Sequence, residues 1–446
     1  MKKSYKAYSA IFIMFLFLPA LSLLSCNTSN SDTPEASDSV EPLQSNDAQN
    51  FEDLKEDVDI LEYSDFEKFV MGNNDFSFSL YHEAKAINGE KNMFISPYSI
   101  SCALAMAWAG ARGDTEAQMA EALNFSFSQA DIHTFFNDLH ETLNTKGADN
   151  PEGFRLYVSN ALWGQEGFHF EQDYLDIISE KYGSGVINFL DFISEPEPSR
   201  IIINKWVEEQ TEKRIKDLLP QGSVTSNSRL VITNTIYFLA DWLNKFKSGK
   251  TQRQDFYLVD GSIETVDMMH QLNVFPYTEG SDYQAVELLY KDEKTSMIVI
   301  LPEDGEFNTV DHSLNATRVR QMVREMSDHK VSLSLPKFSF GYTMNGLAGI
   351  LTNMGMIDAF FPATSDFSGI TGNKDLTISK IAHKAFVRVD EEGTEAAAAT
   401  GTLMGATSVP EVDTAMKIDR PFIFVILDKE TGSILFIGSV VDPTLS

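Results

Sequence analysis

Alternation of apolar and polar residues predicts strands most clearly near the C-terminus. Residues 376–390, LTISKIAHKAFVRVD, contain period-two stretches that predict one long strand. Residues 420–443, RPFIFVILDKETGSILFIGSVVDP, form two apolar runs on either side of a Lys429 to Gly432 turn, which predicts a hairpin. The run ISCALAMAWAG, residues 100–110, is apolar throughout and predicts a buried helix. The chain therefore combines helices and strands.

Between the predicted strand and hairpin, small uncharged side chains replace large apolar ones. In the segment EEGTEAAAAT, the change from the flanking strands begins at Gly393, where the missing Cβ lets the backbone bend. Successive side chains of a strand face opposite sides, so Glu395 and Leu403 would share the outer face of this segment. The inner face would carry no charge, because it would consist of Thr394, Ala396, Ala398, Thr400, Thr402, Met404 and Ala406.

This segment has the composition needed to enter an existing sheet as a new strand. The alternative is a flexible linker rich in Ala, Gly and Thr. The strands predicted on both sides favour an exposed loop over a linker between domains.

Motifs over residues 66–443 resemble the serpins, serine protease inhibitors of the loop-insertion type. These motifs are specific and follow one another in the order that the family has. They are NMFISPYSISCALAMAWAGARGDTEAQMAEALNF (92–125), VITNTIYFLADWLNKF (231–246), LPKFSF (335–340), DFSGIT (366–371), HKAFVRVDEEGTEAAAAT (383–400) and RPFIFVI (420–426).

The resemblance implies an α+β serpin fold with three β-sheets, eight to nine helices and an exposed reactive-centre loop at about residues 391–417. It also implies a mechanism. A target protease would cleave the loop and form an acyl-enzyme, and the freed loop would insert into the largest sheet and distort the trapped protease. Such an insertion adds a strand to an existing sheet and releases strain stored in the intact protein.

The resemblance also assigns site residues along the loop. The scissile bond would lie fourteen residues past Gly393, at Thr407–Ser408, which suits elastase-like or subtilisin-like proteases. Because the segment before Arg420 is longer than in many relatives, Leu403 and Met404 are secondary candidates. The hinge would comprise Gly393, Thr394, Glu395, Ala396, Ala397, Ala398, Ala399 and Thr400. We expect the hinge to be exposed before cleavage, so that substitution of Thr394 by Arg scarcely alters the intact protein.

Two polar groups match positions under the large sheet. The first would hold the middle of the sheet shut by hydrogen bonds, and it consists of Ser96, Ser99, Asn234 and His383. On its own, His383 would be interpreted as a core histidine. The second would lie where the loop enters the top of the sheet; it consists of Trp242, Lys337 and Glu391, with an ion pair between Lys337 and Glu391.

The N-terminus predicts export. Residues 1–25 have a basic start and a short apolar core, and LLSC at 23–26 resembles the lipobox of bacterial lipoproteins, in which Cys26 is lipidated. An ordinary signal peptide or an uncleaved anchor is the alternative. Residues 26–62 are acidic and poor in aromatics, which is typical of a disordered tether, and 63–446 would form the serpin domain. We therefore expect an exported membrane lipoprotein in the outer membrane, at the cell surface or in the periplasm.

The formal charge of −30 argues against nucleic-acid binding, which requires clustered cations. The acidic surface would steer basic proteases toward the protein or simply keep it soluble. SGKT at 248–251 lacks the glycine of a phosphate-binding loop, and neither His82 nor His140 has a second histidine four residues on, so we expect no cofactor and no metal.

Cys102 would be a buried core residue. The partners would be serine proteases, with cysteine proteases as a second class, together with a membrane reached through the lipid anchor, and the protein would be a monomer. An inhibitor is favoured over a non-inhibitory binding module or chaperone and over an unrecognised enzyme.

Overall fold

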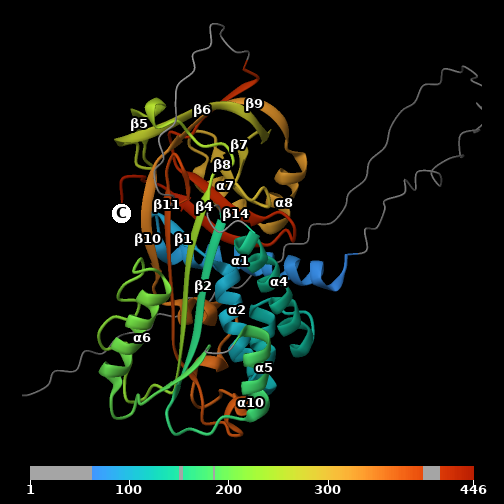
Figure 1. Ribbon diagram of the computed structural model, residues 1–446, viewed down its shortest axis with the longest axis vertical. Helices are drawn as coiled ribbons and strands as arrows, with labels where there is room; N and C mark the ends of the chain where they lie inside the picture. The colour runs from blue at the N-terminus through green and yellow to red at the C-terminus, as the bar shows by residue number, and fades with distance from the viewer. Residues whose placement is uncertain (1–62, 150–153, 184–185, 395–411, 446) are drawn as a thin grey trace, which may run out of the picture. The chain divides into compact units, whose positions relative to one another are not determined.

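A computed structural model describes residues 63–149, 154–183, 186–394 and 412–445 (Figure 1). Several predictions lie outside these residues: the signal peptide, the tether and Cys26, the hinge from Glu395 to Thr400, and the bond Thr407–Ser408 with Leu403 and Met404. The fold below is that of the unit formed by residues 62–446.

The first sheet has six strands in the order β10-β11-β12-β4-β2-β3. Below β12, strands β11 and β4 pair directly and in parallel, from Ile378 opposite Leu230 to Phe386 opposite Tyr237. The strands are β2 (Phe154–Gln165), β3 (Ile187–Leu190), β4 (Leu230–Asp241), β10 (Phe338–Met344), β11 (Ile378–Val389) and β12 (Gly393–Thr394).

The second sheet has nine strands, in the order β1-β15-β14-β8-β7-β6-β9-β13 with β5 paired to β6. The predicted hairpin is confirmed, because β14 and β15 pair antiparallel. The strands are β1 (Met93–Ile95), β5 (Gln252–Tyr257), β6 (Ile263–Glu279), β7 (Tyr283–Leu289), β8 (Thr295–Pro302), β9 (Ser327–Pro336), β13 (Thr414–Lys417), β14 (Phe422–Asp428) and β15 (Ile434–Val440).

The described strands thus form two hydrogen-bonded networks where three sheets were expected. The reason is the length of β6, whose 17 residues belong to two parts of the nine-stranded network. From Met268 to Tyr277 it pairs with β9, whereas Tyr277 to Glu279 pair with β7.

Helices cover both faces of the six-stranded sheet. All twelve residues of α2 are buried, and this helix contacts β2 and β4 of one sheet and β15 of the other. On the opposite face, α6 packs through Ile203 and Val207 on Trp163 and Val231. Strands β2 and β4 are therefore covered on both faces, and the alternation of their side chains divides them between two cores, with Ile232 in the core that contains α2 and Val231 in the other.

Ten α-helices lie in the described residues, and three of them have seven residues or fewer, which accounts for the excess over the expected eight to nine. They are α1 (Asp65–Asn88), α2 (Pro97–Trp108), α3 (Gly113–Ala122), α4 (Gln129–Asp149), α5 (Gln172–Tyr182), α6 (Pro196–Gln210), α7 (Phe307–Ser313), α8 (Ala316–Glu325), α9 (Leu347–Asn353) and α10 (Ser368–Thr371). The 3-10 turns are η1 (Ser248–Lys250) and η2 (Asp358–Phe360).

Candidate functional site at the top of the six-stranded sheet

The two residues of β12 already lie between β4 and β11. Gly393 pairs with Asp241 and Thr394 with Ala240 of β4, while Thr394 also pairs with Val389 of β11. A Cβ on Gly393 would lie 2.1 Å from the carbonyl oxygen of Ala240, so only glycine fits here without a shift of backbone. The sheet is therefore closed along most of β11 and opened by one short strand at its end.

Thr394 is fully buried, at 0% exposure, which contradicts the expectation of an exposed hinge at this position. Its hydroxyl lies 2.8 Å from the hydroxyl of Tyr290, which is also buried. The reason is that the segment before the loop is held by β4 on one side and β11 on the other. The alternation of the sequence placed the side chain of Thr394 on the inner face of the segment, and the buried side chain in the structure agrees with this.

The residues matched to the top of the sheet surround this strand. The indole of Trp242 is buried, donates to the carbonyl of Asp390 at 3.0 Å and stacks on Tyr290 at 4.7 Å between ring centroids. The expected ion pair is present, with Lys337 Nζ 2.7 Å from Glu391 Oε2. Although partial burial raises the pKa of Glu391, hydrogen bonds from Lys337 and Thr251 hold it below its ordinary value.

Sequence reasoning missed further contacts that fasten residues 390–394. Lys245 bridges Asp241 and Glu392 at 2.8 and 2.7 Å. The backbone N–H of Trp242 donates to the carbonyl of Glu392 at 2.8 Å. The charged run after Asp390 and the basic run after Asp241 were visible in the sequence, but only the fold brings the two segments together.

The predicted cluster under the middle of the sheet is assembled. Ser96, Ser99, Asn234 and His383 are all at 0% exposure. Ser96 is the N-cap of α2, where its hydroxyl accepts from the N–H of Ser99 at 3.3 Å and donates to the carbonyl of Leu435 at 2.7 Å. Asn234 donates to the carbonyl of Ser99 at 2.7 Å and also contacts His383 Nδ1.

The contacts of His383 fix its tautomer. Its Nε2 accepts from the backbone N–H of Ser96 at 3.3 Å, and because an N–H can only donate, this nitrogen carries no proton. Nδ1 therefore donates to Asn234. Burial lowers the pKa of His383 to about 3, so the ring is neutral at pH 7. The His383–Asn234 bond crosses directly from β11 to β4, and separating these strands breaks it.

Asn160 of β2 is a fifth member that the sequence analysis did not name. Its side-chain oxygen accepts from Asn234, and its amide donates to the carbonyl of Ser99 at 3.3 Å. An asparagine directly before the apolar residues Ala161, Leu162 and Trp163 was a usable signal, because a polar side chain in a largely buried strand needs a partner.

The second cysteine of the chain lies within the described residues. Cys102 is a buried free thiol, and burial raises its pKa to about 12. The parts of the chain that the structure describes contain no group of three His, Cys, Asp or Glu residues able to hold a metal ion. Within the same ranges, no helix has the length and apolar character that a bilayer crossing requires.

Comparisons with known proteins agree with this geometry. Residues 71–443 match the family model described as serpin (serine protease inhibitor). An uncharacterized serpin-like protein of Thermococcus kodakarensis is 39% identical over 420 residues, 93% of each chain. The leukocyte elastase inhibitor of Xenopus tropicalis is 36% identical over 82% of this chain and 97% of its own.

Among solved structures, the native state of tengpin, a thermophilic serpin, is similar with a TM-score of 0.76. The two sequences are 31% identical, over 84% of this chain and 94% of the tengpin chain. The chain therefore belongs to the serpin family.

Proposed function

We propose that this protein inhibits serine endopeptidases of the elastase or subtilisin type, with cysteine proteases as a second target class, by trapping them as acyl-enzymes. In this mechanism the protease supplies the nucleophile and this chain supplies the cleaved bond. The cleaved loop then continues β12 downward between β4 and β11.

One observation carries the proposal. A two-residue strand that leads directly into the loop already separates the ends of β4 and β11, while the rest of these strands pair with each other. After Glu395, the residues from Ala396 to Thr402 are small, and the face that the alternation assigns to the sheet interior would carry no charge. Extension of β12 replaces one β4–β11 ladder with two, and each added hydrogen bond contributes about 0.5 to 1.5 kcal/mol net.

Incubation with elastase-, subtilisin-, trypsin- and papain-type proteases tests the proposal. An inhibitor gives a denaturant-resistant complex on a gel and releases a C-terminal peptide. Mass spectrometry of that peptide identifies the cleaved bond, which we place at Thr407–Ser408. Complete cleavage without complex would instead support the non-inhibitory alternative.

We also propose that the mature protein is anchored through a lipid on Cys26. The support is the LLSC sequence at the end of the apolar signal. Metabolic labelling with an alkynyl fatty acid should mark the wild type and not Cys26→Ala. Equal labelling of both proteins contradicts the anchor.

A further inference from the structure

A cavity of about 590 Å³ lies beside the strand that follows the loop, outside the site described above. Three segments form its walls: the turn between β5 and β6, the connection from β8 to α7, and the corner after β13. The backbone N–H of Tyr257 donates to the carbonyl of Asp419 at 2.8 Å and joins two of these walls.

The β5–β6 turn gives the cavity an apolar wall, and the other two walls carry acidic side chains. Tyr257 is 46% exposed and Val259 is 36% exposed, although both are large hydrophobic residues. Three carboxylates line the cavity, those of Glu303, Asp304 and Asp419, against a single guanidinium. No cation contacts Asp304 in the part of the chain that the structure describes.

The one guanidinium is already engaged. Arg420 donates to the carbonyl of Pro302 at 2.8 Å and lies 3.5 Å from Asp419 and 3.8 Å from Glu303. Asp419 is also paired with Lys417, whose Nζ lies 3.1 Å from its Oδ2. The negative charge that the cavity presents next to an aromatic face is therefore that of Asp304. A Lys or Arg side chain fits both, because a cation binds carboxylates and also the face of a tyrosine.

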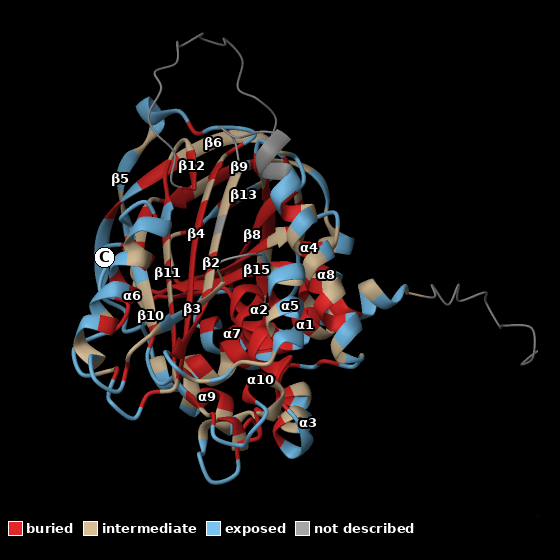
Figure 2. Cartoon of the chain, turned by 60° about the horizontal axis from the view of Figure 1, so that its bottom comes forward, coloured by how far each residue is buried: buried red, intermediate tan, exposed pale blue. Residues whose placement is uncertain are grey.

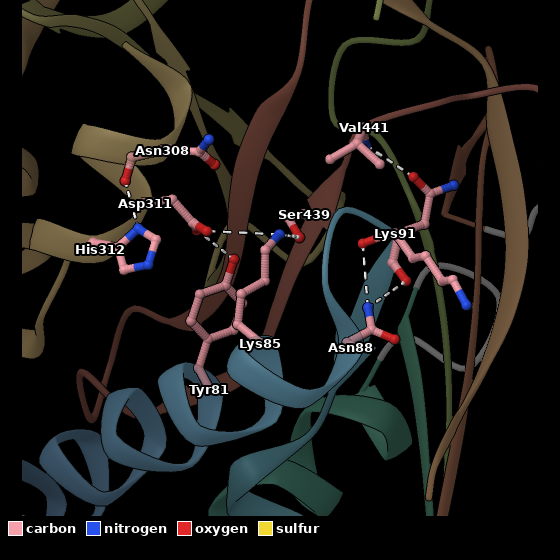
Figure 3. A network of polar contacts seen from close by, with 10 residues as sticks. Tyr81, Lys85, Asn88, Lys91, Asn308, Asp311, His312, Ser439 and Val441 are labelled. Carbon is pink, nitrogen blue, oxygen red and sulfur yellow. Dashed lines mark hydrogen bonds and ion pairs between the residues drawn. The ribbon is translucent and has the colours of Figure 1, made fainter. Parts of the chain in front are cut away.

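A buried polar network lies next to one residue of the cavity lining, and Figure 3 shows its members Tyr81, Lys85, Asp311 and Ser439. Phe307 lines the cavity, and Lys85 Nζ lies 5.1 Å from the centroid of its ring. Lys85 donates to Ser439 at 2.9 Å and pairs with Asp311, which accepts from Tyr81 at 2.6 Å. The positive charge of Lys85 next to Phe307 is thus compensated within the network, so it does not neutralise the acidic side chains that line the cavity.

Two walls of the cavity follow β5 and β13, and Figure 2 shows these strands at the same end of the described molecule as β12, whose last residue leads into the loop. Asp419 follows β13 and is twelve positions beyond Thr407, a span of at most about 40 Å. A protease of about 240 residues is roughly 45 Å across, so an enzyme bound to the loop reaches this region.

We propose that this cavity, lined by Tyr257, Val259, Glu303, Asp304, Phe307 and Asp419, is a secondary docking site for a basic surface loop of the target protease. The inference rests on the proposed inhibitory function and specifies its partner: a protease that carries a Lys or Arg near the rim of its active-site cleft. The site sets the rate of encounter and the choice of target, and the loop sets the bond that is cleaved.

The test uses full-length protein and a basic elastase-type protease whose catalytic serine is replaced by alanine. The dissociation constant is measured for wild type, Asp304→Lys and Tyr257→Ala. The matched control is Asp328→Lys, an equal charge change at an exposed residue of β9. We expect Asp304→Lys to weaken binding about tenfold, with a reduced salt dependence, and the control to change it less than about twofold.

Equal weakening by Asp304→Lys and Asp328→Lys would reduce the effect to overall charge and overturn the site. Wild-type binding no tighter than that of an isolated 391–417 peptide would also overturn it. The active protease separates the two proposals. If Asp304→Lys weakens docking but no variant forms a denaturant-resistant complex, the docking site stands and the inhibitory function fails.

Discussion

At Thr394 the buried side chain reverses the expected effect of a charged substitution on the intact protein. An arginine in place of this threonine would have to bury an unpaired guanidinium, at a penalty of several kcal/mol. We expect Thr394→Arg to expel β12 from between β4 and β11 and to lose its hydrogen bond to Tyr290. The intact variant should be destabilised by about 2 to 3 kcal/mol.

Urea unfolding of the uncleaved protein checks this, together with the fluorescence of Trp242, which stacks on Tyr290. Thr394→Val is the control, because it keeps the shape and removes only the hydroxyl. The number of inhibitor molecules consumed per protease inactivated should be higher for Thr394→Arg than for wild type. Wild-type stability and fluorescence in intact Thr394→Arg would show that the hinge is not inserted.

His383 predicts a pH dependence of stability. Its folded pKa of about 3 lies below the unfolded value of about 6.5, so the unfolded state binds the proton first. The stabilisation by the neutral ring is complete above about pH 6.5 and is lost as pH falls toward 3, at about 1.4 kcal/mol per pH unit. Protonation would also place an N–H of the ring against the N–H of Ser96.

Burial likewise lowers the pKa of His133, to about 4, so this residue also makes the free energy of unfolding fall as the pH falls in the same range. Unfolding free energies between pH 7 and 5 for wild type, His383→Gln and His133→Gln separate the two. Each substitution should remove about half of the pH dependence of the unfolding free energy that His383 and His133 contribute together. A His383→Gln slope equal to that of wild type contradicts the assignment.

At the scale of elements, β12 depends on a glycine for its position. Gly393→Ala places a methyl group against the backbone of Ala240 and Asp241, which cannot move without disturbing β4. We expect slower loop insertion and therefore more cleaved, non-inhibiting protein per protease inactivated. Gly249→Ala is the control, because nothing lies within 4 Å of a Cβ at that residue of η1. Equal stoichiometry for the two variants would contradict this role of Gly393.

The elements also show what the sequence could and could not predict. Period-two alternation located β11 to within two residues and gave the inner-face direction of Thr394, because both are local properties. The resemblance brought Ser96, Ser99, Asn234 and His383 together correctly. The insertion of Gly393 and Thr394 could not be predicted, because it depends on the register between β12 and β4, which are separated by about 150 positions.

Contacts made by residues outside any motif were missed for the same reason. Tyr290 meets Thr394 only because β7 ends beside β4, at the bridge between Trp242 and Tyr290. The cavity beside Asp419 is likewise formed by three segments that are distant in sequence. Pattern and composition describe each segment by itself, and the pairing of segments decides which side chains meet.

At the scale of the whole molecule, β4 and β11 pair directly along most of their length, so the proposed mechanism predicts that the intact protein can still gain stability. In the proposed mechanism, cleavage in the loop would free residues 395–407 to add a full strand between these two, with an expected gain on the order of 10 kcal/mol from about a dozen residues bonded on both sides. For the unit of residues 62–446, the entropy of unfolding is about 0.8 kcal/mol/K. A gain of this size raises the midpoint of thermal unfolding by about 10 °C or more.

Calorimetry of intact and loop-cleaved wild type checks this expectation, and cleaved Gly393→Ala should gain less because its strand starts with a clash. The comparison also separates two explanations of any inhibition. A cleaved protein that unfolds at the temperature of the intact one gains nothing from its loop, so a protease stopped by it would be held by surface contacts alone. A large gain in wild type that shrinks in Gly393→Ala identifies the strand between β4 and β11 as the source of the free energy.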